Sequence, residues 1–262
     1  MNFPKRTKKS DALKVVKNGE TYTLPEAWAL TDSGSYTFRN KITDHAFAHG
    51  GDCVGDGKID GRTIQVEFSM KGLTEEEHDE EVNRAYAAFS QTNYDLYCGR
   101  ADRLYHVAGL SKIKHKFLDG FKQRWSEITV SLLLSDPFRY EGRASKVTYE
   151  FPKDVKDADL VVYNLGSVDT PLTFTFTPLE KMPNITIWHR EAKEKFSVAD
   201  SLLIAPATLM VNGKEGTVWR GNANSINTFS GGFLHAKPGF NLFHYTGAAG
   251  KIEISYVNRW FV

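Results

Sequence analysis

The side chains best suited to bind a metal ion gather between residues 44 and 53. His45 and His49 are four residues apart, with Asp44, Asp52 and Cys53 close by. On a helix, two histidines at this spacing would offer nitrogen ligands to one metal ion. Gly50-Gly51 interrupts any helix at this point. The sequence therefore favours polar loop histidines over a metal site.

The neighbouring segment 52–60 matches a calcium-binding loop in part. Read from Asp52 as the first position, the EF-hand pattern is met at Asp56, Gly57, Ile59 and Asp60. Val54 and Thr63 stand where oxygen ligands are required, and the flanking residues look like strands. A glycine-rich hairpin loop without calcium is the favoured interpretation.

Motifs for enzymatic chemistry are missing from the sequence. It has no Gly-x-Ser-x-Gly, no glycine-rich phosphate loop, no dinucleotide fingerprint and no Cys-x-x-Cys pair. Paired carboxylates for sugar hydrolysis leave no sequence signature, because they meet only in space. We expect a protein that is not an enzyme and needs no cofactor.

Two tryptophans could bind a sugar, because an indole face can lie under a pyranose ring while polar neighbours supply hydrogen bonds. His189-Arg190 follows Trp188, and Trp219 is followed by Arg220 and Asn222. The alternative is that both tryptophans are core or subunit-contact residues. A carbohydrate-binding module for host-surface recognition is therefore the second candidate function.

Length and composition limit the class of protein. The 262 residues fit two domains, and 41% apolar and 13% aromatic residues favour β structure with real cores. The net charge of +1 gives no overall attraction for nucleic acid. Two cysteines do not make a disulfide scaffold, and no apolar run is long enough to cross a membrane. The basic residues 5–9 are read as a solvated arm, or else as an arm that docks on an acidic partner.

The first half of the chain predicts antiparallel strands and one helix. Apolar residues alternate in residues 64–70 and again at Ile128, Val130, Leu132 and Leu134. Thr74 and Glu77 form a capping box before a helix over about 75–90. Asn18-Gly19 predicts a hairpin turn, whereas residues 25–60 read as a long irregular loop.

The second half predicts an all-β domain. Asp136-Pro137 ends the last strand of the first half, and a polar joint follows at 141–145. Short apolar pieces separated by turn residues then recur, typical of a β-sandwich, over residues 147–151, 172–176, 185–188, 202–204, 208–211, 218–219 and 252–256. The fold class is mainly β, with an α+β domain at 1–142 and a sandwich at 143–262.

Three short motifs resemble the distal tail proteins of long-tailed phages. The first is the strand motif with Arg62, Ile64 and Val66, and the second is Asp136-Pro137-Phe138 before Tyr140. The third, Lys237-Pro238-Gly239-Phe240-Asn241, is similar to a turn in the galectin-like sandwich that such proteins carry. The galectin sugar-binding signature itself is not visible.

This resemblance implies a structural role in a phage or prophage virion tail. Six copies would form a ring that joins the tail tube protein to the baseplate hub and to an adhesin or tail fibre. The first domain would surround the passage for DNA, which would pass without specific binding, and the galectin-like domain would be a docking platform. Neither a cofactor nor a membrane is implied.

Overall fold

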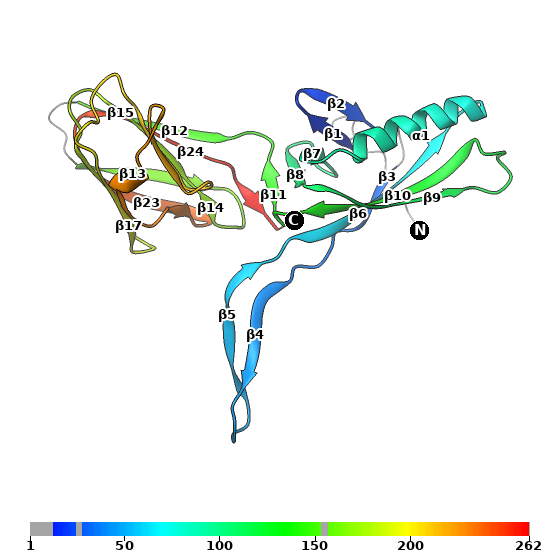
Figure 1. Ribbon diagram of the computed structural model, residues 1–262, viewed down its shortest axis with the longest axis horizontal. Helices are drawn as coiled ribbons and strands as arrows, with labels where there is room; N and C mark the ends of the chain where they lie inside the picture. Colours follow the sequence, from blue (N-terminus) through cyan, green and yellow to red (C-terminus); the bar gives the residue numbers. More distant parts are fainter. Residues whose placement is uncertain (1–12, 25–27, 153–156, 262) are drawn as a thin grey trace. The chain divides into compact units, whose positions relative to one another are not determined.

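The computed structural model describes residues 13–24, 28–152 and 157–261 (Figure 1). Contacts divide the chain into two compact units, residues 1–142 and residues 143–261. Each unit has its own cluster of buried apolar side chains. None of the described helices is long and apolar enough to span a membrane.

The first unit contains two antiparallel sheets. The first sheet, in spatial order, has β2 (Glu20–Thr23), β1 (Lys14–Lys17), β7 (Tyr94–Tyr97), β8 (Arg103–Val107) and β11 (Arg139–Glu141). The second sheet has β3 (Trp28–Asp32), β6 (Arg62–Lys71), β10 (Trp125–Leu134) and β9 (Gly109–Phe117). Both sheets contribute to one core, which is shared with the helix α1 (Glu75–Phe89). The predicted hairpin at Asn18-Gly19 is confirmed, because β1 and β2 pair directly across these two residues.

The centre of this unit is the pair β6 and β10, which run antiparallel over ten residues each. Their alternation predicts the buried face correctly, since Ile64 and Val66 on β6 and Ile128 and Val130 on β10 are all 0% exposed. Period-2 alternation placed these strands because only one face of each lies against the core.

The helix α1 begins where the capping box predicts. The Thr74 hydroxyl accepts a hydrogen bond from Glu77 N at 3.1 Å, and the Glu77 carboxylate accepts one from Leu73 N at 2.7 Å. Its inner face lies on the sheet, where the rings of Phe89 and Phe68 stack with centroids 5.5 Å apart. Figure 1 shows the helix lying over the strands of this unit.

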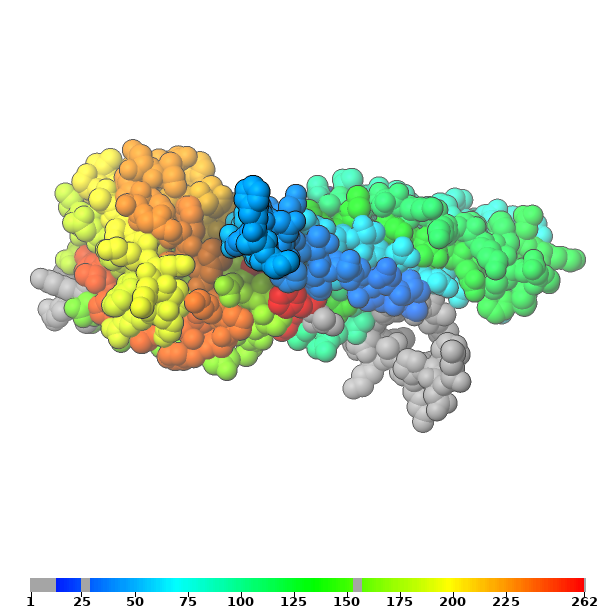
Figure 2. All heavy atoms as spheres, turned by 90° about the horizontal axis from the view of Figure 1, so that it is seen from below, coloured from blue at the N-terminus to red at the C-terminus, as the bar shows by residue number. Residues whose placement is uncertain are grey.

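The predicted irregular loop over residues 25–60 is wrong for its described part. Besides β3, this segment forms a two-stranded hairpin of β4 (Phe38–Asp44) and β5 (Gly51–Ile59), which projects away from the sheets of its unit (Figure 1). The tip (blue) faces the viewer in Figure 2. Almost every side chain of the hairpin is exposed. Because neither face is buried, the sequence carries no apolar alternation that would predict the two strands.

The second unit is a β-sandwich. One sheet, in spatial order, has β12 (Ser145–Phe151), β24 (Gly250–Tyr256), β15 (Thr173–Pro178), β18 (Leu209–Asn212), β19 (Thr217–Arg220) and β20 (Ala223–Asn224). The other has β13 (Asp157–Asn164), β23 (Gly239–Thr246), β16 (Asn184–His189), β17 (Glu194–Ala199) and β21 (Phe229–Gly231). Smaller elements are β14 (Thr170–Pro171), β22 (His235–Ala236), the 3-10 helix η2 (Ile226–Thr228) and β25 (Arg259–Trp260).

The core between the two sheets is aromatic. Phe174 and Phe176 of β15 meet Phe196 of β17 edge-on, with ring centroids 5.4 and 6.4 Å apart. The expected strand at 202–204 is wrong, because Leu202 and Ile204 are exposed and only Leu203 enters the core. A run of three apolar residues in a turn looks like a buried strand when only its composition is read.

Candidate functional site

Trp188 lies on the outer face of the five-stranded sheet and is 41% exposed. Strand alternation puts it there, because its neighbours Ile187 and His189 point into the core and are each 0% exposed. Thr186 and Arg190 lie on the same outer side and border the same open pocket as Trp188. The indole is therefore available to a ligand and is not part of the core.

The pocket beside Trp188 crosses three adjacent strands. Pairing places Lys195 of β17 and His244 of β23 directly opposite Trp188, on its two sides. The depression is open to solvent and has a volume of about 750 Å³. This Trp188 pocket is lined by Thr186, Trp188, Arg190, Lys193, Lys195, His244 and Thr246.

One carboxylate beside the pocket contacts both the His244 ring and the Arg190 guanidinium. Asp159 Oδ1 lies 2.8 Å from His244 Nδ1 and 3.1 Å from Arg190 Nη2. The Arg190 guanidinium also lies 6.0 Å from the centre of the Trp188 ring, at the outer limit of a cation–π contact. Arg190 is thereby held at the edge of the pocket, between Asp159 and the indole.

The lysines of the Trp188 pocket have no such partner. In the described part of the chain, neither Lys193 nor Lys195 forms an ion pair, and no aspartate or glutamate lines the pocket. Glu191, on the same hairpin, turns away and accepts a hydrogen bond from Leu242 N at 3.2 Å. The pocket therefore has a surplus of positive charge.

The second sugar-binding candidate lies elsewhere. Trp219 is on β19, in the opposite sheet, so the structure does not bring it together with Trp188. Arg220 is bound to the buried Asp200, with its Nη1 2.5 and 2.6 Å from the two carboxylate oxygens. Asn222 lies exposed in the turn between β19 and β20. Arg220 is thus engaged inside the unit.

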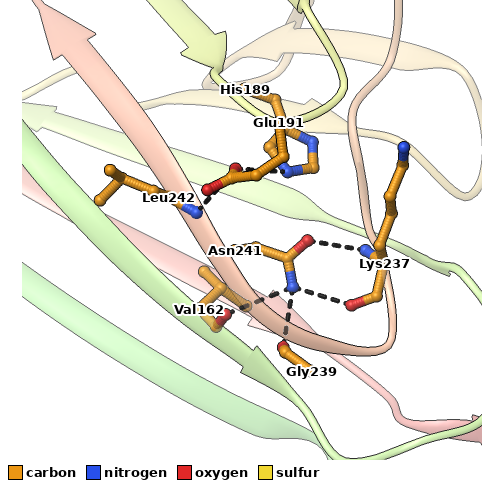
Figure 3. Close-up of polar contacts among 7 residues, drawn as sticks. All are labelled: Val162, His189, Glu191, Lys237, Gly239, Asn241 and Leu242. Carbon is orange, nitrogen blue, oxygen red and sulfur yellow. Dashed lines mark hydrogen bonds and ion pairs between the residues drawn. The ribbon is translucent and has the colours of Figure 1, made fainter.

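The Lys237–Asn241 motif forms a turn closed by one buried side chain (Figure 3). Asn241 Oδ1 accepts a hydrogen bond from Lys237 N at 2.8 Å, and its Nδ2 donates to Lys237 O at 2.8 Å and to Gly239 O at 2.9 Å. Gly239 has φ +91°, a conformation that favours glycine. Pro238 and Gly239 make the turn, and Asn241 ties it to β23.

His189 lies next to this turn in the core (Figure 3). Its ring is fully buried against Phe243, with centroids 4.3 Å apart. Neither ring nitrogen has a well-formed hydrogen bond, although Nε2 lies 3.3 Å from Glu191 Oε2. Burial lowers the pKa of His189, and Glu191 opposes part of that shift.

The motif residues of the first unit serve its packing. Ile64 and Val66 are core residues, and Arg62 donates to Ser33 O at 2.6 Å while lying over the ring of Tyr36. Asp136 accepts a hydrogen bond from Phe138 N at 3.2 Å across Pro137, and it also accepts one from the Tyr140 hydroxyl. These contacts fix the chain where the first unit ends.

A serine, a histidine and an aspartate meet in the first unit, but the serine and the histidine are inaccessible. His78 Nε2 lies 2.9 Å from Ser126 Oγ, and its Nδ1 lies 3.4 Å from Asp79 Oδ1. Ser126 and His78 are both 0% exposed, so no substrate reaches this hydroxyl. The bond fastens α1 to β10. The sequence did not indicate it, since the two residues are 48 positions apart.

The metal-binding candidates lie on the exposed hairpin. His45 Nε2 is 3.5 Å from Asp52 Oδ1, and the described residues contain no group of three or more histidine, cysteine or acidic side chains that could hold a metal ion. Cys53 is exposed on the same hairpin, while Cys98 is buried in the first unit and both are free thiols. The described residues of this hairpin therefore form no metal site.

Comparisons with known proteins show similarity at the level of structure. No protein-family model matches the sequence, and no curated protein shows a significant match. Among solved structures, the crystal structure of the SPP1 Dit protein (gp 19.1) matches with a TM-score of 0.70 at 13% identity, covering 94% of this chain and 98% of that chain.

The chain has a Dit-like fold. The SPP1 Dit protein is described as a paradigm of the hub adsorption apparatus in phages that infect Gram-positive bacteria. The resemblance read from three short motifs is therefore confirmed at the level of fold, and so is the mainly β class with antiparallel sheets and a helix packed on one of them. At 13% identity, the likeness to SPP1 Dit is one of fold.

Proposed function

We propose that this chain is a structural component of a phage tail tip or baseplate. The observation that carries the proposal is the match to SPP1 Dit over almost the whole of both chains, through both units. A likeness confined to one unit would fit many β-sandwich proteins with unrelated functions. Its role in the virion tail is assembly, not catalysis.

In this role, six copies form a ring between the tail tube protein and the baseplate hub. An adhesin or tail fibre attaches further out, and DNA passes through the ring. The net charge of +1 is consistent with a ring that lets DNA pass without binding it tightly, because DNA affinity grows with the number of cationic contacts to phosphate. Closed rings of identical subunits need two different surfaces on each copy that fit one another.

The β4–β5 hairpin is our candidate for one of these surfaces. It exposes Phe38, Ile42, Phe47 and Val54, and Ile42 and Phe47 are 74% and 110% exposed. No core of its own covers these side chains, so a partner surface would remove them from water. The occupant we assign is a neighbouring copy of this chain.

One double serine variant and a matched double control test this contact. Ile42→Ser with Phe47→Ser should lower the fraction of assembled protein in sedimentation, measured with the purified chain alone and with its hub partner. The control is Leu179→Ser with Leu202→Ser, which removes two exposed apolar side chains, 63% and 66% exposed, from the second unit. Equal assembly by both variants would contradict the hairpin contact.

We also propose that the two units are independent domains, divided between Gly142 and Arg143. The first would build the ring, and the second would be a docking platform of galectin-like type. Separate cores support this division. Residues 143–262 expressed alone should melt cooperatively, and an unfolded fragment would argue against it.

The second candidate function is a carbohydrate-binding module. The observation that favours it is the half-exposed indole of Trp188 in an open pocket that also presents threonine hydroxyls. A glycan array with the full chain, repeated with Trp188→Ala, tests it. Absence of binding at millimolar sugar would remove this candidate and leave the tail-tip proposal untouched.

A further inference from the structure

The Trp188 pocket differs from a neutral sugar site in its charge. Arg190, Lys193 and Lys195 line it, whereas its lining includes no carboxylate. The nearby Asp159 is already bound to Arg190 and His244. The charge of Arg190 is offset by Asp159, so Lys193 and Lys195 supply the surplus positive charge that attracts an anionic ligand group.

The indole and the lysines lie side by side because of strand pairing. Trp188 and Lys195 are opposite residues of β16 and β17, and Lys193 lies in the turn that joins these strands, with φ +57°. Opposite residues on one face have Cβ atoms about 5 Å apart. A ligand that stacks on the indole therefore brings its substituents within reach of both ammonium groups.

We propose that the Trp188 pocket binds an anionic carbohydrate, a pyranose that carries a phosphate or carboxylate group. The sugar ring lies on the indole, and the anionic group lies between Lys193 and Lys195. Thr246 and His244 offer hydrogen bonds to ring hydroxyls, whereas the Thr186 hydroxyl is already bonded to Ser197 Oγ at 3.0 Å. This inference rests on the carbohydrate-binding candidate and is independent of the tail-tip proposal.

A single-stranded nucleic acid is the main competing ligand, since it also combines aromatic stacking with cationic contacts. Such sites present several aromatic side chains along a basic groove. The described lining of this pocket has Trp188 as its only large aromatic side chain, and the His244 ring beside it is already bound to Asp159. A short saccharide with one anionic group fits this arrangement better.

Calorimetry with the full chain at low salt tests the proposal. The probes are glucose, glucose 6-phosphate, glucuronic acid and a short oligothymidylate. We expect both charged sugars to bind at least about tenfold more tightly than glucose, and to lose that advantage at high salt. Trp188→Ala should weaken binding of every sugar, because the indole contacts the ring in each case.

Charge variants separate the anionic inference from simple sugar binding. Lys193→Gln with Lys195→Gln should remove the preference for charged sugars and leave glucose binding unchanged. The control, Lys181→Gln with Lys214→Gln, makes the same charge change on residues of this unit that do not line the pocket. All variants are checked for an unchanged melting transition, which exposed substitutions should preserve.

The outcomes are distinct. Equal affinity for charged sugars and glucose would overturn the anionic inference while keeping the carbohydrate candidate. No binding of any sugar would overturn both and leave the tail-tip proposal standing. Tighter binding of the oligonucleotide than of the charged sugars would overturn the carbohydrate assignment in favour of nucleic acid.

Discussion

Asn241 and Lys237 are joined by two hydrogen bonds, in which one side-chain amide both accepts from and donates to the backbone of the same residue, each at 2.8 Å. Asn241 is 1% exposed, and its amide also donates to Gly239 O. The Asn241 side chain thus supplies hydrogen-bond partners for three backbone groups of this turn, namely Lys237 N, Lys237 O and Gly239 O.

Asn241→Ala should lower the free energy of unfolding of the second unit by about 3 kcal/mol, because it leaves buried backbone groups without partners. Urea denaturation followed by tryptophan fluorescence measures this. Asn222→Ala, an exposed turn residue, is the control and should change stability by less than about 0.5 kcal/mol. Similar losses in both variants would contradict the bridging role of Asn241.

Asp200 and Arg220 form a second structural pair, so Arg220 should affect stability and not sugar binding. Asp200→Ala leaves a part-buried guanidinium unpaired and should cost about 3 to 5 kcal/mol. Combining it with Arg220→Met should recover much of that loss. Thermal melts check the stability, and unchanged glycan binding by the double variant separates this site from the Trp188 pocket.

Labelling of the two cysteines can show whether the hairpin is covered in the assembly. Cys53 is exposed on β5, whereas Cys98 is buried, which raises the pKa of its thiol to about 12. A maleimide should therefore label Cys53 alone in the folded subunit. In assembled protein that labelling should slow markedly if a neighbouring copy covers the hairpin. Unchanged labelling on assembly would show that the hairpin stays open, and Cys53→Ser identifies the labelled site.

Acid should destabilise the second unit through His189. Burial lowers the pKa of His189 below the ordinary 6.5, so the folded state holds the ring neutral. The unfolded state then binds the proton more readily, and stability present above about pH 6.5 is lost as the pH falls through this range. Glu191 and Glu194 favour the charged ring, and Lys237 opposes it.

Melting temperatures at about pH 7.5 and about pH 5 measure this effect. The drop should be smaller for His189→Gln than for the natural chain. Part of the drop should remain, because burial also lowers the pKa of His235 in the same unit. An identical drop in both proteins would show that His189 does not titrate on unfolding.

The sequence predicted the elements that bury one face in a core. Alternation identified β6 and β10, and the capping box at Thr74 placed the start of α1. The hairpin at 38–59 escaped prediction because both of its faces are exposed, so no periodicity marks it.

The candidate site was predicted in part. Trp188 could be singled out as an aromatic residue with polar neighbours, but the lysines could not be joined to it without the register of β16 and β17. A symmetric hairpin centred on Glu191 and Ala192 would have placed Lys195 opposite Trp188. Trp219 had the same polar context in sequence, yet its Arg220 is held inside the unit by the buried Asp200, whereas Arg190 is held by Asp159 at the edge of an open pocket. Context in sequence does not show which carboxylate an arginine pairs with, or whether that pair borders a pocket.

We propose above all that copies of this chain build a closed ring at a phage tail tip. Electron microscopy of the purified chain, alone and mixed with its hub partner, tests this most directly. We expect closed rings with six subunits in at least one of the two samples. A strict monomer in both, at concentrations where a hub partner would be saturated, would contradict the account.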